Sequence, residues 1–317
     1  MKYSRSFSKL MAAIALALAL AGCGNHDRTR VVVSMRDMSE PYEKALVEGL
    51  RDEADKLGVR LMVVDGFNNP EKQMVDLESA RVQKVDGVLT FPQNETVFPR
   101  IQALLDDGIP VNVLSPPTDN KLERAGFVHG DDLMIGKMMG EWVVGRYPSG
   151  ARVAILSGPL DHAASIKRVQ GMHEVLSAHG DQYPVVLEKP GNWHRAEAVK
   201  VMQQFVEATP LEKMPQVILA ANDEMAMGAL DALQISGRNQ LGIALVGCDA
   251  TPVALAAVSH GQLAATVDQA AAKQAQFALR SLLARIGEKG PVPNEAIEPV
   301  MVTATTLAKP SASTQMR

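Results

Sequence analysis

Two polar residues follow apolar runs that have the character of buried strands, and both side chains are suited to hydrogen bonding a small ligand. Asn222 follows the run 217–221, and Asp249 follows the run 244–248. A helical pattern comes after each, and Asp223 is expected to cap the first of these helices at its amino end. Open α/β sheets bind ligands at the carboxyl ends of their strands. We therefore predict that Asn222 and Asp249 point into one crevice.

The elements that must position these side chains form an alternating series. Short apolar runs are separated by amphipathic segments, an order that favours parallel sheets with right-handed crossovers. The expected strands are 31–35, 60–65, 87–91, 111–114, 152–157, 184–189, 217–221 and 244–248. Helical patterns between them include 42–57, 70–84, 97–107, 132–146 and 196–208.

Two glycines in the helical pattern 132–146 are spaced four residues apart. Gly136 and Gly140 therefore lie on one face of that helix, where they would let a neighbouring backbone approach closely. We interpret this pair as a packing feature rather than as part of a ligand site.

Three ordered motifs carry a resemblance to a known family. The segment around Asn222, the turn 246–252 and the segment 261–269 resemble the ribose-binding type of bacterial solute-binding protein, over a span from about Val31 to about Thr306. The resemblance implies the type I periplasmic binding protein fold, an α/β architecture of two similar lobes. Each lobe would be a parallel sheet flanked by helices.

The resemblance also implies how the chain is divided between the lobes. A three-crossover hinge would join them near Gly130, Gln269 and Pro293. The first lobe would contain residues 31–130 and 270–293, and the second residues 131–269 and 294–309.

Members of this family hold a sugar by paired hydrogen bonds from Asn, Asp and Arg and by aromatic rings stacked on the apolar faces of the ring. Planar amide, carboxylate and guanidinium groups match the donors and acceptors of a polyol two at a time. The positions that match this pattern are Arg168, Trp193, Asn222, Asp249 and Gln269.

The expected first lobe departs from the ribose pattern. Tyr42 retains an aromatic position, whereas Phe91 replaces an asparagine and Ser115–Pro116 replaces an aspartate–arginine pair. Arg36 and Glu40 stand where the family has neutral groups, either facing the pocket or lying at the surface beside a helix start. We therefore expect a ligand other than ribose: a neutral sugar with different hydroxyl placement, or a polyol.

A sugar acid is the alternative ligand. In that case Arg36 and Arg168 would be the partners of its carboxylate.

The amino end predicts export. Lys2, Arg5 and Lys9 precede an apolar segment, 11–21, that is too short for an ordinary transmembrane span. The following Leu-Ala-Gly-Cys resembles a lipobox, in which Cys23 would be acylated after removal of residues 1–22. Ordinary signal cleavage is the alternative. Residues 23–30 would then form a membrane tether, and residues 310–317 are expected to be a disordered tail.

Composition excludes several other classes of function. The net charge is −4, and removal of residues 1–22, which carry three positive charges, leaves a mature chain near −7, so no nucleic-acid partner is expected. The histidines have no compact ligand spacing and the cofactor motifs are missing, so neither a metal nor a cofactor is predicted. If Cys23 is acylated, Cys248 has no partner for an internal disulfide. We expect a monomer.

Three functions fit these observations. The first is a binding protein that closes around a sugar and delivers it to the permease of an ABC importer. The second has the same fold but presents the ligand to a chemoreceptor or sensor kinase. The third is an exported glycosidase that uses carboxylates such as Glu40 and Asp249. We predict a binding protein rather than an enzyme, because carboxylates in a sugar cleft are ordinary hydrogen-bond acceptors.

Overall fold

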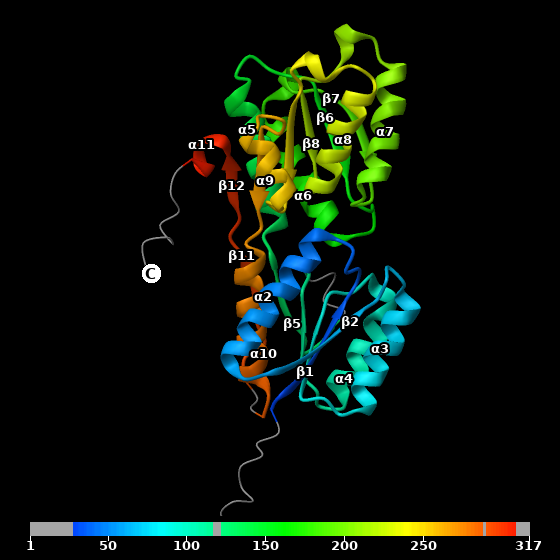
Figure 1. The fold of residues 1–317 in the computed structure, drawn as a ribbon, viewed down its shortest axis with the longest axis vertical. Coiled ribbons are helices and arrows are strands. Elements are labelled where there is room, and N and C mark those ends of the chain that lie inside the picture. The colour runs from blue at the N-terminus through cyan, green and yellow to red at the C-terminus, as the bar shows by residue number, and fades with distance from the viewer. Residues whose placement is uncertain (1–27, 117–121, 288–289, 309–317) are drawn as a thin grey trace, which may run out of the picture.

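Two six-stranded sheets, each covered by helices, form two lobes that are stacked along the long axis of the molecule (Figure 1). The computed structural model describes residues 28–116, 122–287 and 290–308. The expected signal peptide, the predicted acylation site Cys23 and the tail 310–317 lie outside the described residues.

The first lobe is built from the beginning of the described chain and from a later return. Its elements are β1 (Arg30–Met35), α2 (Pro41–Leu57), β2 (Arg60–Asp65), α3 (Pro70–Val82), β3 (Gly87–Thr90), η1 (Glu95–Val97), α4 (Phe98–Asp106), β4 (Val111–Val113), β5 (Gly126–Gly130), α10 (Ala271–Arg285) and β11 (Asn294–Ile297). The strand order is β11-β5-β4-β3-β1-β2, and all neighbours are parallel.

The second lobe repeats this plan. It contains α5 (Asp132–Arg146), β6 (Val153–Ser157), α6 (Ala163–Ser177), η2 (Gly180–Gln182), β7 (Val185–Pro190), α7 (Arg195–Ala208), η3 (Leu211–Lys213), β8 (Val217–Ala220), α8 (Asp223–Ile235), η4 (Asn239–Leu241), β9 (Ala244–Cys248), α9 (Pro252–Ser259), β10 (Ala265–Asp268), β12 (Val300–Thr303) and α11 (Ala304–Leu307). The strand order is β12-β10-β9-β8-β6-β7, and only the edge strand β12 is antiparallel to its neighbour. The predicted fold class is confirmed.

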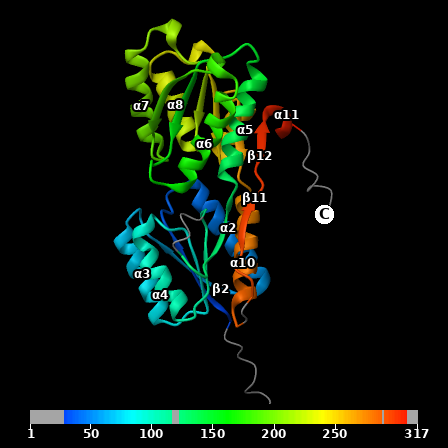
Figure 2. The same ribbon diagram turned by 180° about the vertical axis from the view of Figure 1, so that it is seen from behind.

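The chain passes between the sheets three times, and Figures 1 and 2 show β5, α10 and β11 on the side where the lobes are joined. The first two passages follow β5 and β10, near Gly130 and Gln269 as expected. The third lies between Ile297 and Val300, so its prediction near Pro293 is wrong. Residues 294–297 belong to the first sheet because they form β11 and pair with β5.

Apolar side chains on both faces of the parallel strands form the cores. In β1, Val31 and Val33 pack towards α2 and α10, while Val32 packs in a separate cluster with Leu77 and Ile101 from α3 and α4. Strands that are buried on both faces have continuous apolar sequences, which is why these strands could be predicted from the sequence.

The glycine pair in α5 packs as predicted. A Cβ at Gly136 would overlap the backbone carbonyl of Arg168 in α6, and one at Gly140 would be 2.8 Å from the Cβ of Val175. The two helices therefore approach each other along their glycines, and this contact holds the helix that carries Arg168.

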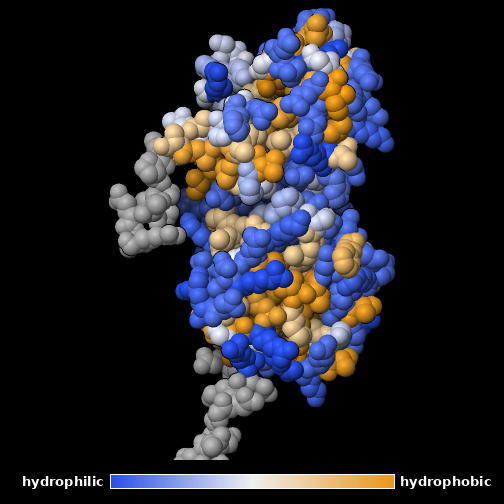
Figure 3. All heavy atoms as spheres, viewed as in Figure 1, coloured by the Kyte–Doolittle hydropathy of each residue, from blue (hydrophilic) through white to orange (hydrophobic). Residues whose placement is uncertain are grey.

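The surface is mostly hydrophilic on the face drawn in Figure 3, and apolar residues are visible in the first lobe between α2 and α3. The edge strand β2 is only half-buried there. Within the described part of the chain, every helix is too short or too polar to cross a membrane.

Candidate ligand-binding cleft

Loops at the carboxyl ends of five consecutive strands line the second lobe's side of a cleft between the lobes. Gln269 follows β10, Asp249 follows β9 and Asn222 follows β8. Arg168 lies in α6, the helix that follows β6, and Trp193 follows β7 at the other edge. The strand-end rule therefore brings the predicted residues of this lobe together.

Asn222, rather than Asp223, caps helix α8. The side-chain oxygen of Asn222 accepts a hydrogen bond from the backbone N–H of Met225, and its amide donates to the carbonyl of Trp193. Asp223 is fully buried and accepts from the backbone N–H of Thr251 and the hydroxyl of Thr266. The prediction that Asp223 caps this helix is wrong by one residue. Its carboxylate instead accepts hydrogen bonds from Thr251 and Thr266, which lie after and in the neighbouring strands β9 and β10.

A buried polar network surrounds Asp249. The amide of Gln269 donates to its carboxylate, and Nη1 of Arg168 lies 4.0 Å from Oδ1. Arg168 also donates from Nε to Oδ1 of Asp132 at 2.8 Å. Burial raises the pKa of Asp249 to about 7, although the positive charge of Arg168 opposes this shift.

The first lobe contributes a second arginine that contacts a carboxylate. Arg36 follows β1 and is 9% exposed. Its Nε donates to Oε1 of Glu43 at 2.8 Å, and its Nη2 lies 2.8 Å from the same oxygen. Burial raises the pKa of Glu43 to about 7 against the pull of Arg36. Arg36 therefore faces the cleft with a partner already in place, which resolves the alternative that it lies at the surface.

Aromatic rings continue across the cleft from one lobe to the other. Tyr42 meets Phe91 edge-on with centroids 6.4 Å apart, Phe91 meets His162 at 6.3 Å, and His162 meets Trp193 at 5.6 Å. The guanidiniums of the two arginines lie 5.2 Å and 5.5 Å from the ring centres of Phe91 and Trp193. Such a row offers apolar faces to the C–H groups of a sugar ring.

Two polar atoms in this row are buried without a hydrogen-bond partner. They are Nδ1 of His162 and Nε1 of Trp193. Burial and the charges of Arg36 and Arg168 lower the pKa of His162 to about 3, so its ring is neutral at physiological pH. Buried polar groups normally have partners, so these two atoms are well suited to bind hydroxyl groups of a ligand.

Sequence reasoning missed His162. The rule that ligands bind at the carboxyl ends of strands could have identified it, because His162 lies in the loop between the strand expected at 152–157 and Arg168. Its ring contacts come from Phe91 in the first lobe and Trp193 in another loop, and no sequence pattern reveals these.

The two lobes also touch through a polar contact between two side chains. Oε1 of Glu40, at the start of α2, lies 3.0 Å from Nδ1 of His194, at the start of α7. Glu40 is 8% exposed and lines the cleft, so it too faces the other lobe rather than solvent.

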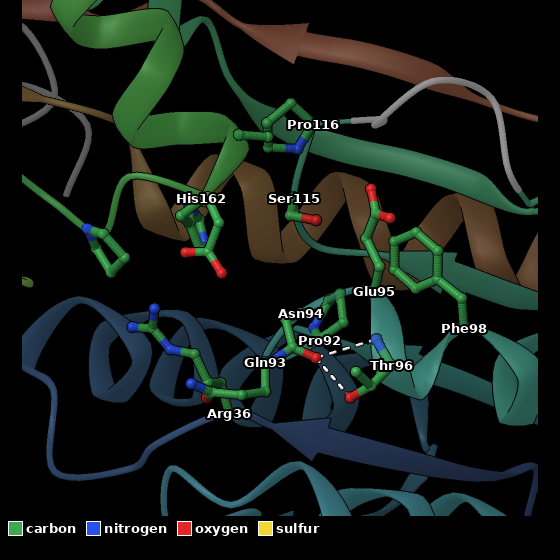
Figure 4. A pocket seen from close by; sticks show the side chains of 13 residues that line it. Arg36, Pro92, Gln93, Asn94, Glu95, Thr96, Phe98, Ser115, Pro116 and His162 are labelled. Carbon is green, nitrogen blue, oxygen red and sulfur yellow. Dashed lines mark hydrogen bonds between the residues drawn. The ribbon is translucent and has the colours of Figure 1, made fainter.

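The cleft contains an inner cavity, an outer cavity and, beside Glu40 and His194, a third cavity of about 190 Å³. Eight of the nine predicted ligand-binding residues line the inner cavity of about 40 Å³: Arg36, Tyr42, Phe91, Arg168, Trp193, Asn222, Asp249 and Gln269. The ninth, Ser115, lines the outer cavity of about 460 Å³ (Figure 4). All nine therefore lie in one cleft, and their roles in binding stay predictions. Among the described residues, no cluster of His, Cys, Asp and Glu could hold a metal ion.

Comparison with known proteins gives one family. Residues 31–290 match the model of the periplasmic binding protein domain. The chain is 32% identical to the ribose import binding protein of Escherichia coli strain K12, over 84% of this chain and 87% of that protein. It is 29% identical to a xylitol-binding protein of Mycolicibacterium smegmatis, over 84% of this chain and 76% of that protein.

A solved structure is similar over almost its full length. The Caulobacter myo-inositol binding protein bound to myo-inositol superposes with a TM-score of 0.85 at 33% identity, covering 92% of this chain and 99% of that one.

Proposed function

The chain belongs to the family of periplasmic binding proteins, and on this premise we propose that it captures a neutral polyhydroxylated ligand for an ABC importer. The ligand class is a monosaccharide, a cyclitol or a related polyol. The lobes close on it by a hinge motion at the three crossings, and the closed form is the one presented to the permease.

The assignment of a neutral ligand rests on the carboxylate partners that both arginines of the cleft already have. Arg36 is hydrogen-bonded to Glu43, and Arg168 is held by Asp132 with Asp249 close by. A ligand carboxylate would have to displace one of these partners and would add negative charge beside the remaining carboxylates. A sugar acid is therefore the weaker alternative.

The relatives support this class of ligand. The three proteins compared above are named for ribose, xylitol and myo-inositol, all of them uncharged polyols. Ser115–Pro116 in place of the aspartate–arginine pair of the ribose type favours a ligand other than ribose.

A direct binding screen tests the proposal. We would titrate the unlipidated mature protein with myo-inositol, ribose, xylitol, allose and glucuronate by isothermal calorimetry. We expect saturable binding of at least one neutral compound and none of glucuronate. Binding of glucuronate in preference to every neutral compound would overturn the neutral-ligand assignment, and no binding of any compound would contradict the polyol class.

We further propose that the protein is anchored to a membrane facing the periplasm through acylated Cys23. The motif that ends the apolar segment supports this. A Cys23→Ser variant should lose incorporation of a fatty-acid probe and move from the membrane to the soluble fraction. Equal labelling of both proteins would refute the anchor.

A further inference from the structure

The outer cavity of the cleft has the properties of a second binding subsite. It measures about 460 Å³, within the range of about 300–1,000 Å³ that is typical of small-molecule sites. Arg36 and His162 line both cavities, so the outer cavity is adjacent to the inner one. Figure 4 shows Arg36, Gln93 and Asn94 on one side of the outer cavity and His162 on the other.

Both apolar and polar groups line this cavity. Phe98 and three prolines supply the apolar surface: Pro92, Pro116 and Pro159. Oε1 of Gln93 is buried without a hydrogen-bond partner, as is Nδ1 of His162. Apolar faces combined with unpartnered hydrogen-bonding atoms are what a polyhydroxylated ring requires.

The wall that carries Gln93 is fixed from behind. Gln73 of α3 is fully buried, donates to the carbonyl of Phe91 at 2.8 Å and accepts from the backbone N–H of Gln93 at 2.8 Å. Next along the chain, Oδ1 of Asn94 accepts from the N–H and hydroxyl of Thr96 at 3.0 Å and 2.6 Å (Figure 4). A rigid wall holds these side chains in place before the ligand arrives, which reduces the entropy cost of binding.

The charges around the outer cavity select against an anionic group. Arg36 at this cavity is engaged by Glu43, and Asp161 adds a carboxylate to the lining. A phosphate or carboxylate substituent would meet these negative charges, whereas a neutral group would not.

We propose that the outer cavity binds a second neutral sugar unit, so that the preferred ligand is a glycosylated polyol rather than a single ring. The inference rests on the proposed function, in which the lobes open at the hinge to admit the first ring among the residues around the small inner cavity. Gln93 and His162 would hydrogen-bond the hydroxyls of the second unit, and Phe98 would stack on its apolar face.

The test compares a ring with its glycoside by calorimetry. The probes are myo-inositol and 1-O-α-galactosyl-myo-inositol, together with allose and methyl alloside as a pair that adds only a methyl group. We expect the galactosyl compound to bind about tenfold more tightly than myo-inositol, which is the gain of one or two well-placed hydrogen bonds. The methyl group should add less than threefold.

Variants of the outer wall separate the two cavities. Phe98→Ala and Gln93→Leu should each reduce affinity for the galactosyl compound about tenfold and leave that for myo-inositol within twofold. Phe67→Ala is the matched control, because Phe67 is an exposed aromatic residue of the same lobe that lies outside both cavities. Circular dichroism would confirm that the variants are folded.

Three results would contradict the outer subsite or the proposed function. If myo-inositol binds and its galactosyl derivative binds more weakly, the outer subsite is refuted while the proposed function stands. An equal effect of Phe98→Ala on both probes also refutes the subsite, because it assigns Phe98 to the first ring. If no ring or glycoside binds, the proposed function itself fails.

Discussion

Asp249 is held in a backbone conformation that side-chain-bearing residues rarely adopt. Its φ is 117°, and that of Trp193 on the neighbouring side of the cleft is 71°. Such conformations cost of order 1–3 kcal/mol each and persist only where the surroundings enforce them. At Asp249 the backbone N–H is fixed by the carbonyl of Val267 at 2.8 Å. Both residues line the inner cavity of the cleft, consistent with a binding role.

Removal of the Asp249 carboxylate should abolish most of the binding. Asp249→Ala leaves the amide of Gln269 without its acceptor and removes a charge near Arg168. We expect affinity for the ligand identified in the screen to fall about 10- to 100-fold, the loss typical of a charged hydrogen bond. Calorimetry measures this, with the exposed Asp181→Ala as the control. Unchanged affinity would remove Asp249 from the site.

The buried carboxyls predict that the ligand-free protein loses stability as pH rises. The pKa of Glu43 and that of Asp249 are raised to about 7, chiefly by burial. Each group's contribution is fully present below its unfolded pKa of about 4 and is lost as pH rises through about 7. The melting temperature should therefore fall between pH 5 and pH 8.

Neutral replacements isolate these two groups from the rest of the titration. A Glu43→Gln, Asp249→Asn double variant should show a smaller fall in melting temperature over the same window, measured by calorimetry. A pH dependence identical to that of the unmodified protein would contradict the assigned cause.

At the level of elements, the contact between α5 and α6 positions Arg168. Gly136 and Gly171 face each other's helices, and a Cβ at either position would overlap backbone atoms of the partner helix. The ion pair between Arg168 and Asp132, the first residue of α5, crosses the same contact. Helix packing and the binding site are therefore coupled.

A methyl group in this contact should damage both stability and binding. Gly136→Ala would push α6 away, and we expect a loss of about 1–3 kcal/mol in unfolding free energy, as for other overpacked cores, together with weaker ligand binding. Urea unfolding and calorimetry measure the two effects.

The same helix supplies the matched control. A Cβ at Gly145 meets nothing within 4 Å, so Gly145→Ala should be neutral or stabilise by up to about 1 kcal/mol. Equal effects of the two substitutions would show that the helix contact is not the cause.

At the level of the whole molecule, the described structure holds its lobes together across the cleft. The polar contact of Glu40 with His194 and the ring contact of Phe91 with His162 both join the first lobe to the second. Interactions formed only when the lobes are close favour the binding-competent closed state, and they raise apparent affinity by increasing its population.

Loss of the bridge between the lobes should therefore weaken binding modestly. His194 is 38% exposed, so solvent screens the pair, and we expect Glu40→Ala to reduce apparent affinity roughly threefold. Small-angle scattering should show a larger ligand-free radius of gyration. Glu174→Ala breaks the Lys137–Glu174 ion pair within the second lobe and serves as the control. An unchanged radius together with unchanged affinity would rule out a role in closure.

The sequence by itself determined the alternation of elements and the positions of the strand-end residues. Strands such as β1 and β8 are buried on both faces, so their apolar runs were visible without a structure. Asn222 and Asp249 followed from the rule that ligands bind at the carboxyl ends of parallel strands. The remaining ligand-binding predictions came from the family resemblance.

Only the tertiary structure decided the rest. The polar, largely exposed edge strand β11 has no apolar pattern of its own, and it forms because β5 offers a hydrogen-bonding edge. Likewise, the pairing of Arg36 with Glu43 and the contacts of His162 depend on which side chains the folded lobes bring together. Local patterns encode strands and helix ends, whereas the charge compensation and aromatic contacts of the cleft arise between residues that are close only after folding.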